Sequence, residues 1–349
     1  MILMGTGTSH GIPVIGCDCA VCRSDDVRDK RLRCSLYVSE PASVVIDTGP
    51  EFRIQALRCG IKRLDAVLLT HSHADHLHGI DDLRVFSHTK SVDPSFNGDC
   101  ETFGEGLPIY ANSQTVNDIE NRFDYVFNPV VEGGGKPKLC MKSFSGKSEP
   151  FYVGNLRIIP LPIMHGNLEV SGYLLTEEKD GCRKSSAYLT DCNFIPEETF
   201  RIIGEQAGQL VHVIIDGLRV EPHSTHFSFE QALEAAERIG AENTWLTHIT
   251  HNMSHTDIQK YVDSVLDNFP VLKKSVSDGG RVGPAFDGLE LSFYPCGCRS
   301  ACLVEVQTNF RLLQISSMRR ASAMPHSVGS LPPSKRHTRL TIVRRGCNR

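Results

Sequence analysis

Four side chains that can bind a metal ion lie within the six residues 71–76, His-Ser-His-Ala-Asp-His. An apolar run precedes them and predicts a buried strand that ends where the motif begins. In an extended segment His71 and His73 point the same way, because side chains alternate with a period of two. We expect Asp75 and His76 to turn back as a helix begins and to serve a second ion. Such ligands suit zinc or manganese, and a His-rich surface loop is the alternative.

Three further strand-like runs each end in one potential ligand. They stop immediately before His165, before Asp191 and before His248. A single His after a strand is usually a solvated loop residue, but core packing does not explain three such ends beside the 71–76 motif. Together these residues predict a binuclear metal site. Two neighbouring cations activate water and neutralise charge on substrate oxygens, which suits hydrolysis of phosphodiesters, thioesters and lactams alike.

Three thiols lie close together near the amino terminus, at Cys17, Cys19 and Cys22. Thiolates at this spacing can converge on one zinc ion, which then requires a fourth nitrogen or sulfur ligand to close a tetrahedron. Disulfide bonds and free buried thiols are the alternatives. No secretory leader is evident, so we expect a reducing compartment, where clustered cysteines bind metal more often than they form disulfides.

With these residues, the chain resembles the metallo-β-lactamase superfamily of binuclear hydrolases. The resemblance implies an α/β fold of four layers, the αββα sandwich. It also implies that one ion is held by His71, His73 and His165, that the other is held by Asp75, His76 and His248, and that Asp191 bridges the two. Asp75 and Asp191 would thus be catalytic as well as metal-binding. Asp47, at the end of an apolar strand, matches a superfamily residue that supports the site without binding metal.

A narrower resemblance is to the PhnP-type cyclic phosphodiesterases, which open phosphoribosyl 1,2-cyclic phosphate. It rests on an amino-terminal Gly-Thr-Gly loop, on the cysteine cluster and on a Thr-His-x-x-His motif that ends at His251, and it covers roughly residues 3–293. This resemblance implies a structural zinc ion held by Cys17, Cys19, Cys22 and His251. The expected cofactors are therefore two catalytic divalent metals, zinc or manganese, and one structural zinc.

His226 is the candidate general acid. It lies 22 residues before His248, the spacing at which the PhnP-type family carries a proposed general acid, and just before a helix predicted over 229–239. A helix amino terminus favours a phosphate group, and a His with a pKa near neutrality can protonate the leaving oxygen. His223 is the substitute if His226 points away, and Asp216 is expected only to support the site. A solvated loop histidine is the alternative interpretation of His226.

The carboxyl end of the chain differs in charge from the rest. Residues 294–349 carry ten Lys or Arg and one Glu, a net charge of +9, which leaves about −13 for residues 1–293 in a chain of net charge −4. The end segment shows little periodicity, so we predict a disordered basic tail outside a hydrolase domain over 1–293. The basic segment has three competing interpretations: an alternatively spliced terminus, translation beyond the usual stop, and an arm that binds nucleic acid.

No segment of the sequence predicts membrane insertion or secretion. Uninterrupted apolar runs stay below about 18 residues, and Met1 begins almost inside the first strand without a basic or apolar leader. We therefore expect a cytoplasmic protein. The first strand looks clipped, which leaves open an upstream start and with it an organelle.

Several functions are compatible with these residues. The first is hydrolysis of a small cyclic phosphodiester such as phosphoribosyl 1,2-cyclic phosphate, favoured by the cysteine cluster and by His226. The second is RNA processing as in tRNase Z, which shares the 71–76 motif but needs a basic arm that the acidic body lacks. A thioesterase or glyoxalase-type hydrolase and a non-enzymatic metal-binding protein remain as further alternatives. The expected partner is a small-molecule phosphodiester, without nucleic acid or membrane, and a homodimer is left open.

Overall fold

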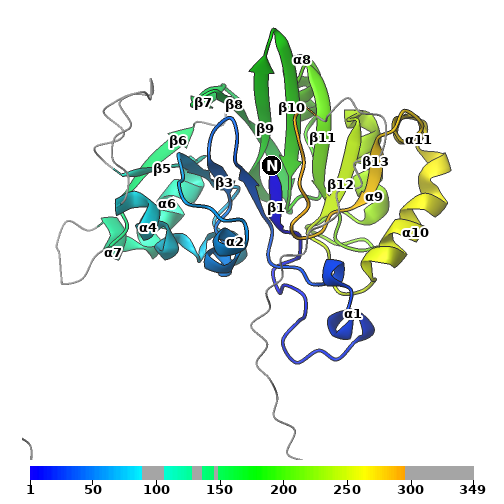
Figure 1. Cartoon of the computed structure of the whole chain (residues 1–349), viewed down its shortest axis with the longest axis horizontal. Coiled ribbons are helices and arrows are strands. Elements are labelled where there is room, and N and C mark those ends of the chain that lie inside the picture. Colours follow the sequence, from blue (N-terminus) through cyan, green and yellow to red (C-terminus); the bar gives the residue numbers. More distant parts are fainter. Residues whose placement is uncertain (89–105, 128–135, 145–147, 295–349) are drawn as a thin grey trace, which may run out of the picture. The chain divides into compact units, whose positions relative to one another are not determined.

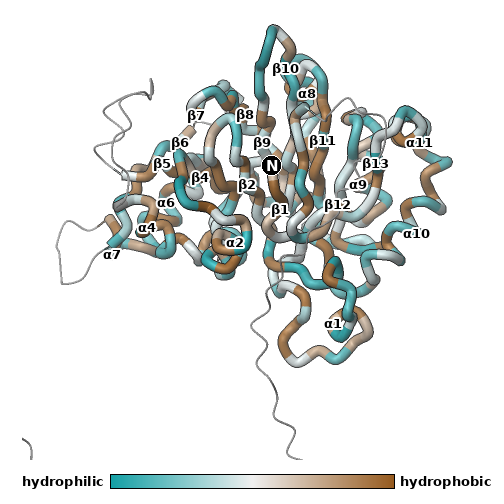
Figure 2. The backbone as a smooth tube through the Cα atoms, in the orientation of Figure 1, coloured by the Kyte–Doolittle hydropathy of each residue, from teal (hydrophilic) through white to brown (hydrophobic). Residues whose placement is uncertain are grey.

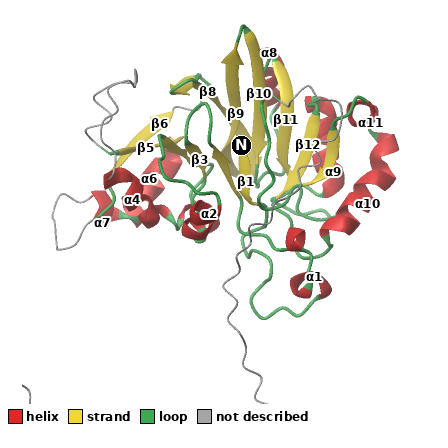
Figure 3. Cartoon of the chain, in the orientation of Figure 1, coloured by secondary structure: helices red, strands yellow, loops and turns green. Residues whose placement is uncertain are grey.

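Two β-sheets pack face to face at the centre of the described chain, as Figures 1 and 3 show. The structure is a computed structural model and describes residues 1–88, 106–127, 136–144 and 148–294. The predicted basic tail lies outside the described residues, apart from its first residue.

The first sheet holds six strands in the order of the sequence: β1 (Ile2–Gly5), β2 (Ser35–Val38), β3 (Val44–Ile46), β4 (Ala66–Leu68), β5 (Leu107–Asn112) and β6 (Leu139–Phe144). Strands β3 to β6 are parallel to one another. The second sheet holds seven strands, again in sequence order: β7 (Phe151–Val153), β8 (Leu156–His165), β9 (Leu168–Lys179), β10 (Cys182–Leu189), β11 (Gln209–Asp216), β12 (Asn243–Thr247) and β13 (Arg281–Pro284). Strands β10 to β13 are parallel.

Helices cover the outer face of each sheet, which confirms the predicted four-layer α/β arrangement (Figure 1). Beside the first sheet lie α2 (Phe52–Arg58), α3 (Ala74–Leu77), α4 (Arg84–His88), α6 (Ser113–Arg122) and α7 (Asp124–Phe127). Beside the second lie α8 (Glu197–Gln206), α9 (Phe229–Ile239), α10 (His255–Val265) and α11 (Pro270–Ser277). The short α1 (Ala20–Arg23) and the 3₁₀ turns Val27–Asp29, Ile80–Leu83 and Leu266–Asn268 complete the helical segments described. None of the described helices combines the length and the apolar character that crossing a membrane requires.

Apolar side chains fill the three interfaces between the four layers. In the parallel strands of the first sheet, Val45 and Val67 face the helices, whereas Ile46 and Leu68 face the second sheet. The sequence of a strand that is buried on both faces is a continuous apolar run, without the alternation of apolar and polar residues seen in half-exposed strands. Figure 2 accordingly shows hydrophobic segments along the strands and a hydrophilic tip on the β9–β10 hairpin.

The directions of the strands gather the predicted site residues at one edge. Strands β8 and β10 are both antiparallel to β9, and β10 is parallel to β12, so these three strands run the same way. The carboxyl ends of strands with a common direction lie at the same edge of a sheet. His165 closes β8, and Asp191 and His248 follow the ends of β10 and β12.

Helix α9, predicted over 229–239, begins at a capping box. Ser228 Oγ accepts a hydrogen bond from the backbone N–H of Gln231 at 3.3 Å, and Gln231 Oε1 accepts one from the N–H of Ser228 at 2.9 Å. Ser228→Ala leaves the N–H of Gln231 at the helix start without its partner, so it should lower the free energy of unfolding by about 0.5–2 kcal/mol. Urea denaturation followed by circular dichroism measures the change.

Ser277→Ala is the control for this variant, because Ser277 is exposed at the end of α11. It should change the free energy of unfolding by less than about 0.5 kcal/mol. Equal losses in the two variants would contradict a specific role for the cap.

Candidate metal centres

Three of the residues at the strand ends adopt a backbone conformation that side chains other than glycine rarely adopt. The φ angles are 64° at Asp47, 54° at Asp191 and 60° at His248. Each such residue costs on the order of 1 kcal/mol and persists where its surroundings hold it in place. Backbone outliers of this kind cluster at functional sites, so three of them at one edge of the sheets indicate that a functional site lies there.

The structure brings together all seven residues predicted for the binuclear site. Their potential ligand atoms form two groups, in each of which the atoms lie within 4.8 Å of one another. The first group is His71, His73, His165 and Asp191, and the second is Asp75, His76, Asp191 and His248. The grouping is the one implied by the resemblance, and Asp191 is the shared member. His73 is exposed, whereas Asp191 and His248 are buried.

The carboxylate of Asp191 lies between histidines of both groups. Its Oδ1 is 2.9 Å from Nε2 of His248, and its Oδ2 is 3.0 Å from Nε2 of His76 and 3.5 Å from Nε2 of His71. Burial alone disfavours the carboxylate, but the neighbouring histidines hold the pKa of Asp191 well below its usual range. An ionised carboxylate in this position can bridge two cations.

Hydrogen bonds fix the orientation of three imidazole rings through their Nδ1 atoms. Nδ1 of His76 lies 2.7 Å from Oδ2 of Asp47, Nδ1 of His71 lies 2.9 Å from Oγ1 of Thr70, and Nδ1 of His165 lies 2.8 Å from a backbone carbonyl oxygen. Asp47 also accepts hydrogen bonds from the backbone N–H and the hydroxyl of Thr70. Holding one ring nitrogen selects the other, Nε2, as the atom free to bind metal.

Buried nitrogen atoms without partners support a metal site. Nε2 of His71, Nε2 of His76 and both ring nitrogens of His248 are buried, and although the Nε2 atoms lie near the carboxylate of Asp191, none of these nitrogens has a hydrogen bond of normal geometry to a described residue. Buried polar atoms are normally satisfied, and leaving one unsatisfied costs about 1–3 kcal/mol. Burial also lowers the pKa of His71 well below its usual value, which favours the neutral imidazole that metals bind. The residues present therefore fit divalent cations.

His226 lies inside the site and pairs with Asp216. Its Nδ1 is 2.8 Å from Oδ2 of Asp216, and its ring stacks on that of His248 with 4.5 Å between centroids. The pairing leaves Nε2 as the free nitrogen of the ring. Burial lowers the pKa of His226 and raises that of Asp216 well above its usual value. Asp216 and His226 also belong to a third group of potential ligand atoms, with Asp191 and His248. Within that group, Asp216 and His226 are already joined to each other by a hydrogen bond.

His223 does not take the place of His226. It is exposed, its ring centroid is 5.3 Å from that of His226, and its Nδ1 accepts hydrogen bonds from Thr225. The expectation that Asp216 only supports the site agrees with its position behind His226. The sequence did not predict the role of Thr70, whose hydroxyl holds the ring of His71. A polar residue closing the apolar strand before His71 was the only available signal.

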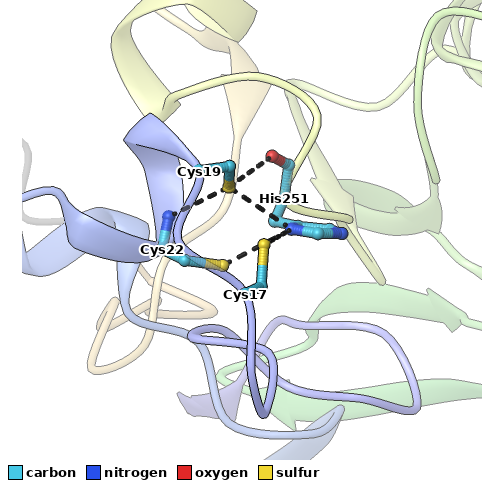
Figure 4. Close-up of side chains that lie close together, drawn as sticks. All are labelled: Cys17, Cys19, Cys22 and His251. Atoms are coloured by element: carbon cyan, nitrogen blue, oxygen red, sulfur yellow. Dashed lines mark hydrogen bonds between the residues drawn. The ribbon is translucent and has the colours of Figure 1, made fainter.

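A separate cluster joins the three cysteines to His251, as Figure 4 shows. The sulfur atoms of Cys17, Cys19 and Cys22 each lie 3.4 Å from Nδ1 of His251. All three cysteines are free thiols rather than disulfides. In a tetrahedron with usual zinc–sulfur and zinc–nitrogen bonds, these atoms are about 3.5 Å apart. The cluster therefore fits a zinc ion.

One loop connects this cluster to the binuclear site. His248 and His251 are three residues apart, and Ile249 between them is tied to the segment that follows β1. The N–H of Ile249 donates to the carbonyl of Thr6 at 3.0 Å, and the carbonyl of Ile249 accepts from the N–H of Thr8 at 3.2 Å. Anchoring His251 therefore also restrains the backbone that presents His248.

Comparisons with known proteins agree with this geometry. Residues 42–249 match the family described as Beta-lactamase superfamily domain. A diphosphatase of the PhnP family, known from its crystal structure, is 33% identical with a TM-score of 0.65, over 84% of this chain and 98% of that one. Zinc-bound PqqB from Methylobacterium extorquens is 19% identical with a TM-score of 0.56, over 83% of this chain and 99% of that one, a likeness of fold alone.

A curated relative carries a different name. The octanoyltransferase of Porphyromonas gingivalis (strain ATCC BAA-308 / W83) is 38% identical over 258 residues, which are 72% of this chain and 46% of that protein. The chain thus spans about half the length of this relative. The family match covers more than half of the present chain, and the PhnP-family structure aligns over almost its whole length. This chain therefore belongs to the metallo-β-lactamase superfamily and is a PhnP-like hydrolase with a fold that implies divalent metal.

Proposed function

We propose that this protein is a binuclear metal-dependent phosphodiesterase that opens small cyclic phosphate esters such as phosphoribosyl 1,2-cyclic phosphate. The observation that carries the proposal is the Asp216–His226 pair, which lies directly beside the seven predicted metal ligands. Opening a cyclic ester of a sugar releases an alkoxide, which needs a proton. A histidine next to the phosphate position can supply that proton.

The residues of the chain divide this work. Two divalent cations, zinc or manganese, would bind here. One would be held by His71, His73 and His165 and the other by Asp75, His76 and His248, with Asp191 between them. These cations would supply an activated water and positive charge opposite the phosphate oxygens. Asp47 and Thr70 keep imidazole rings in their ligand orientation.

His226 would deliver a proton from Nε2 to the leaving oxygen while Asp216 holds its Nδ1. Burial lowers the pKa of the free side chain, so it requires help to remain protonated at neutral pH. A bound phosphate provides that help, because a nearby negative charge raises the pKa of a histidine.

A second candidate function is cleavage of a diphosphate bond. It is favoured by the PhnP-family relative at 33% identity, which is described as a diphosphatase. A phosphate leaving group departs with less need of a proton than an alkoxide, so this reaction would depend less on His226.

A panel of substrates given to the metal-loaded full chain separates the candidates. It contains a ribose cyclic phosphate, 2′,3′-cyclic nucleotides, bis(p-nitrophenyl) phosphate, a nucleoside diphosphate, a precursor tRNA and a thioester. We expect the ribose cyclic phosphate to give the highest kcat/KM. Preference for the diphosphate would favour the second candidate, and preference for the tRNA or the thioester would overturn the proposal.

Asp191→Ala should abolish hydrolysis and lower the content of bound metal. The reason is that one carboxylate lies against histidines of both groups, so its loss affects both ions together. Turnover and elemental analysis measure the two effects. Asp180→Ala is a matched control, since Asp180 also has a positive φ, of 53°, but lies exposed in the β9–β10 turn. Near-normal turnover of Asp191→Ala would show that the site is assembled differently.

His226→Ala should lower kcat by roughly 10²–10⁴ on phosphodiesters with alkyl leaving groups. The loss should be much smaller on p-nitrophenyl esters, whose leaving group needs no proton, and the metal content should stay intact. His223→Ala, at the exposed neighbour, should change neither. Equal losses on both ester types would instead assign His226 to phosphate binding, and a loss of metal would make it a ligand.

Cys19→Ser should remove one metal ion and much of the stability. We expect close to three ions per chain in protein purified without chelator, because a Cys₃His cluster fits a structural zinc beside the binuclear site. Structural zinc contributes directly to folding. Elemental analysis and thermal unfolding follow the two effects, and Cys182→Ser, at an exposed cysteine, is the control. Unchanged metal content in Cys19→Ser would refute the structural zinc.

A further inference from the structure

The loop that carries His226 is exposed over most of its length. Residues 221–224 are exposed, whereas His226 at the end of the loop is buried. From Phe227 onward the backbone is fixed, because the N–H of Phe227 donates to the carbonyl of Cys192 at 2.8 Å and its carbonyl accepts from the N–H of Leu218 at 2.9 Å. Exposed segments with few buried contacts open easily. The position of His226 therefore depends on what holds the residues just before it.

Asn193 joins this loop to the turn between β8 and β9. Its Nδ2 donates to the carbonyl of Ser224 at 3.0 Å, and its Oδ1 accepts from the backbone N–H of Gly166 at 2.8 Å. These partners define which way the amide faces, since a carbonyl needs a donor and an N–H needs an acceptor. Ser224 lies two residues before His226, and Gly166 directly follows His165. One side chain thus bridges the segments that present a predicted metal ligand and the candidate proton donor.

The turn and the loop also contact each other directly. Nδ1 of His165 lies 2.8 Å from the carbonyl oxygen of Thr225, and a Cβ atom on Gly166 would lie 3.0 Å from Cγ2 of Thr225. Gly166 has a φ angle of 61°, so glycine suits this position both for its backbone and for the close approach of the loop. Unlike the contact made by His165, the bridge made by Asn193 uses no side chain of the predicted metal ligands.

The backbone around Asn193 is itself held in place. The N–H of Asn193 donates to the carbonyl of Met164 at 2.9 Å. The N–H of Cys192 donates to Oδ2 of Asp216 at 3.0 Å, the same oxygen that lies 2.8 Å from Nδ1 of His226. A side chain can orient a partner only if it is held by its own surroundings, and Asn193 meets this condition.

We propose that Asn193 is a positioning residue for proton donation, which fixes the loop before His226 against the β8–β9 turn and so holds Nε2 of His226 at the leaving oxygen. The inference rests on the proposed function, since it assumes that His226 protonates this oxygen. Reacting groups must lie within about 0.5 Å of their productive position, and a displacement of about 1 Å can lower a rate about 100-fold. Asn193 therefore acts through His226 and not on the substrate itself.

Asn193→Ala in the metal-loaded full chain removes both hydrogen bonds of the bridge. We expect kcat on a ribose cyclic phosphate to fall by about 10- to 100-fold, with little change in KM. The loss on bis(p-nitrophenyl) phosphate should be much smaller, because its leaving group needs no proton, and the metal content should stay intact. Asn268→Ala is the control, at an exposed asparagine of the 3₁₀ turn Leu266–Asn268, and should change none of these quantities.

Asn193→Asp is a second variant that leaves the size of the side chain unchanged. It keeps an oxygen for the N–H of Gly166 but replaces the donor to Ser224 by a second oxygen, which faces the carbonyl. It should therefore show the same dependence on the leaving group as Asn193→Ala. Native-like turnover of Asn193→Asp on the ribose cyclic phosphate would overturn the proposal.

Hydrogen exchange followed by mass spectrometry gives a readout independent of turnover. The peptide that contains Thr225 and His226 should exchange faster in both variants than in the native protein, because the loop has lost its bond to Asn193. The peptide that contains Gly166 should exchange faster in Asn193→Ala but not in Asn193→Asp, which keeps the acceptor. Native-like exchange of the loop in both variants would overturn the proposal.

Combining Asn193→Ala with His226→Ala tests whether Asn193 acts through His226. The double variant should be no slower on the ribose cyclic phosphate than His226→Ala alone, because the effects of residues that serve one step are not additive. Losses that multiply would overturn the proposal.

The results distinguish the two proposals. A native protein that hydrolyses no phosphodiester overturns the proposed function. In an active native protein, equal losses of Asn193→Ala on both ester types, or a loss of bound metal, would overturn the positioning role alone, because Asn193 would then support the metal site as a whole.

Discussion

The arrangement of the potential metal ligands depends on one buried group, the carboxylate of Asp191. It is buried, ionised and surrounded by imidazoles from both ligand groups, with its two oxygens 2.9 and 3.0 Å from His248 and His76. A buried charge is costly unless opposite charges or good hydrogen bonds compensate it. Positively charged partners must therefore converge here, as protons on histidine or as metal cations. The parallel strands and the left-handed turns that follow them supply this convergence.

The amino-terminal cysteine segment acts on the same site from outside. It contains no residue of the binuclear groups, yet His251 connects it to the loop that carries His248. Backbone hydrogen bonds between Ile249 and both Thr6 and Thr8 add a second tether. A ligand on a loop requires support if its geometry is to stay within the narrow range that metal chemistry needs. A zinc ion bound by the cysteine cluster would thus restrain the short loop that carries His248.

One pair of residues beside the metal ligands has its proposed role on the substrate rather than on the metals. The Asp216–His226 pair lies against His248. Metal ligands are shared throughout the superfamily, so they define metal-assisted chemistry without choosing a substrate. In the proposed reaction, proton donation by His226 is the feature through which this chain would distinguish one phosphate ester from another.

The sequence by itself determined the residue types and the strand ends of the binuclear site, because apolar runs that stop at His165, Asp191 and His248 follow from local patterning. The capping box before α9 was equally local. Local patterning did not say which residues meet; the resemblance implied the metal groups, and the tertiary structure shows the contacts. The contact of Cys17 with His251 spans 234 residues, and the pairing of Asp216 with His226 depends on a loop that folds back over its own strand. Spacing and periodicity describe neighbours along the chain, whereas such contacts arise from the packing of distant strands.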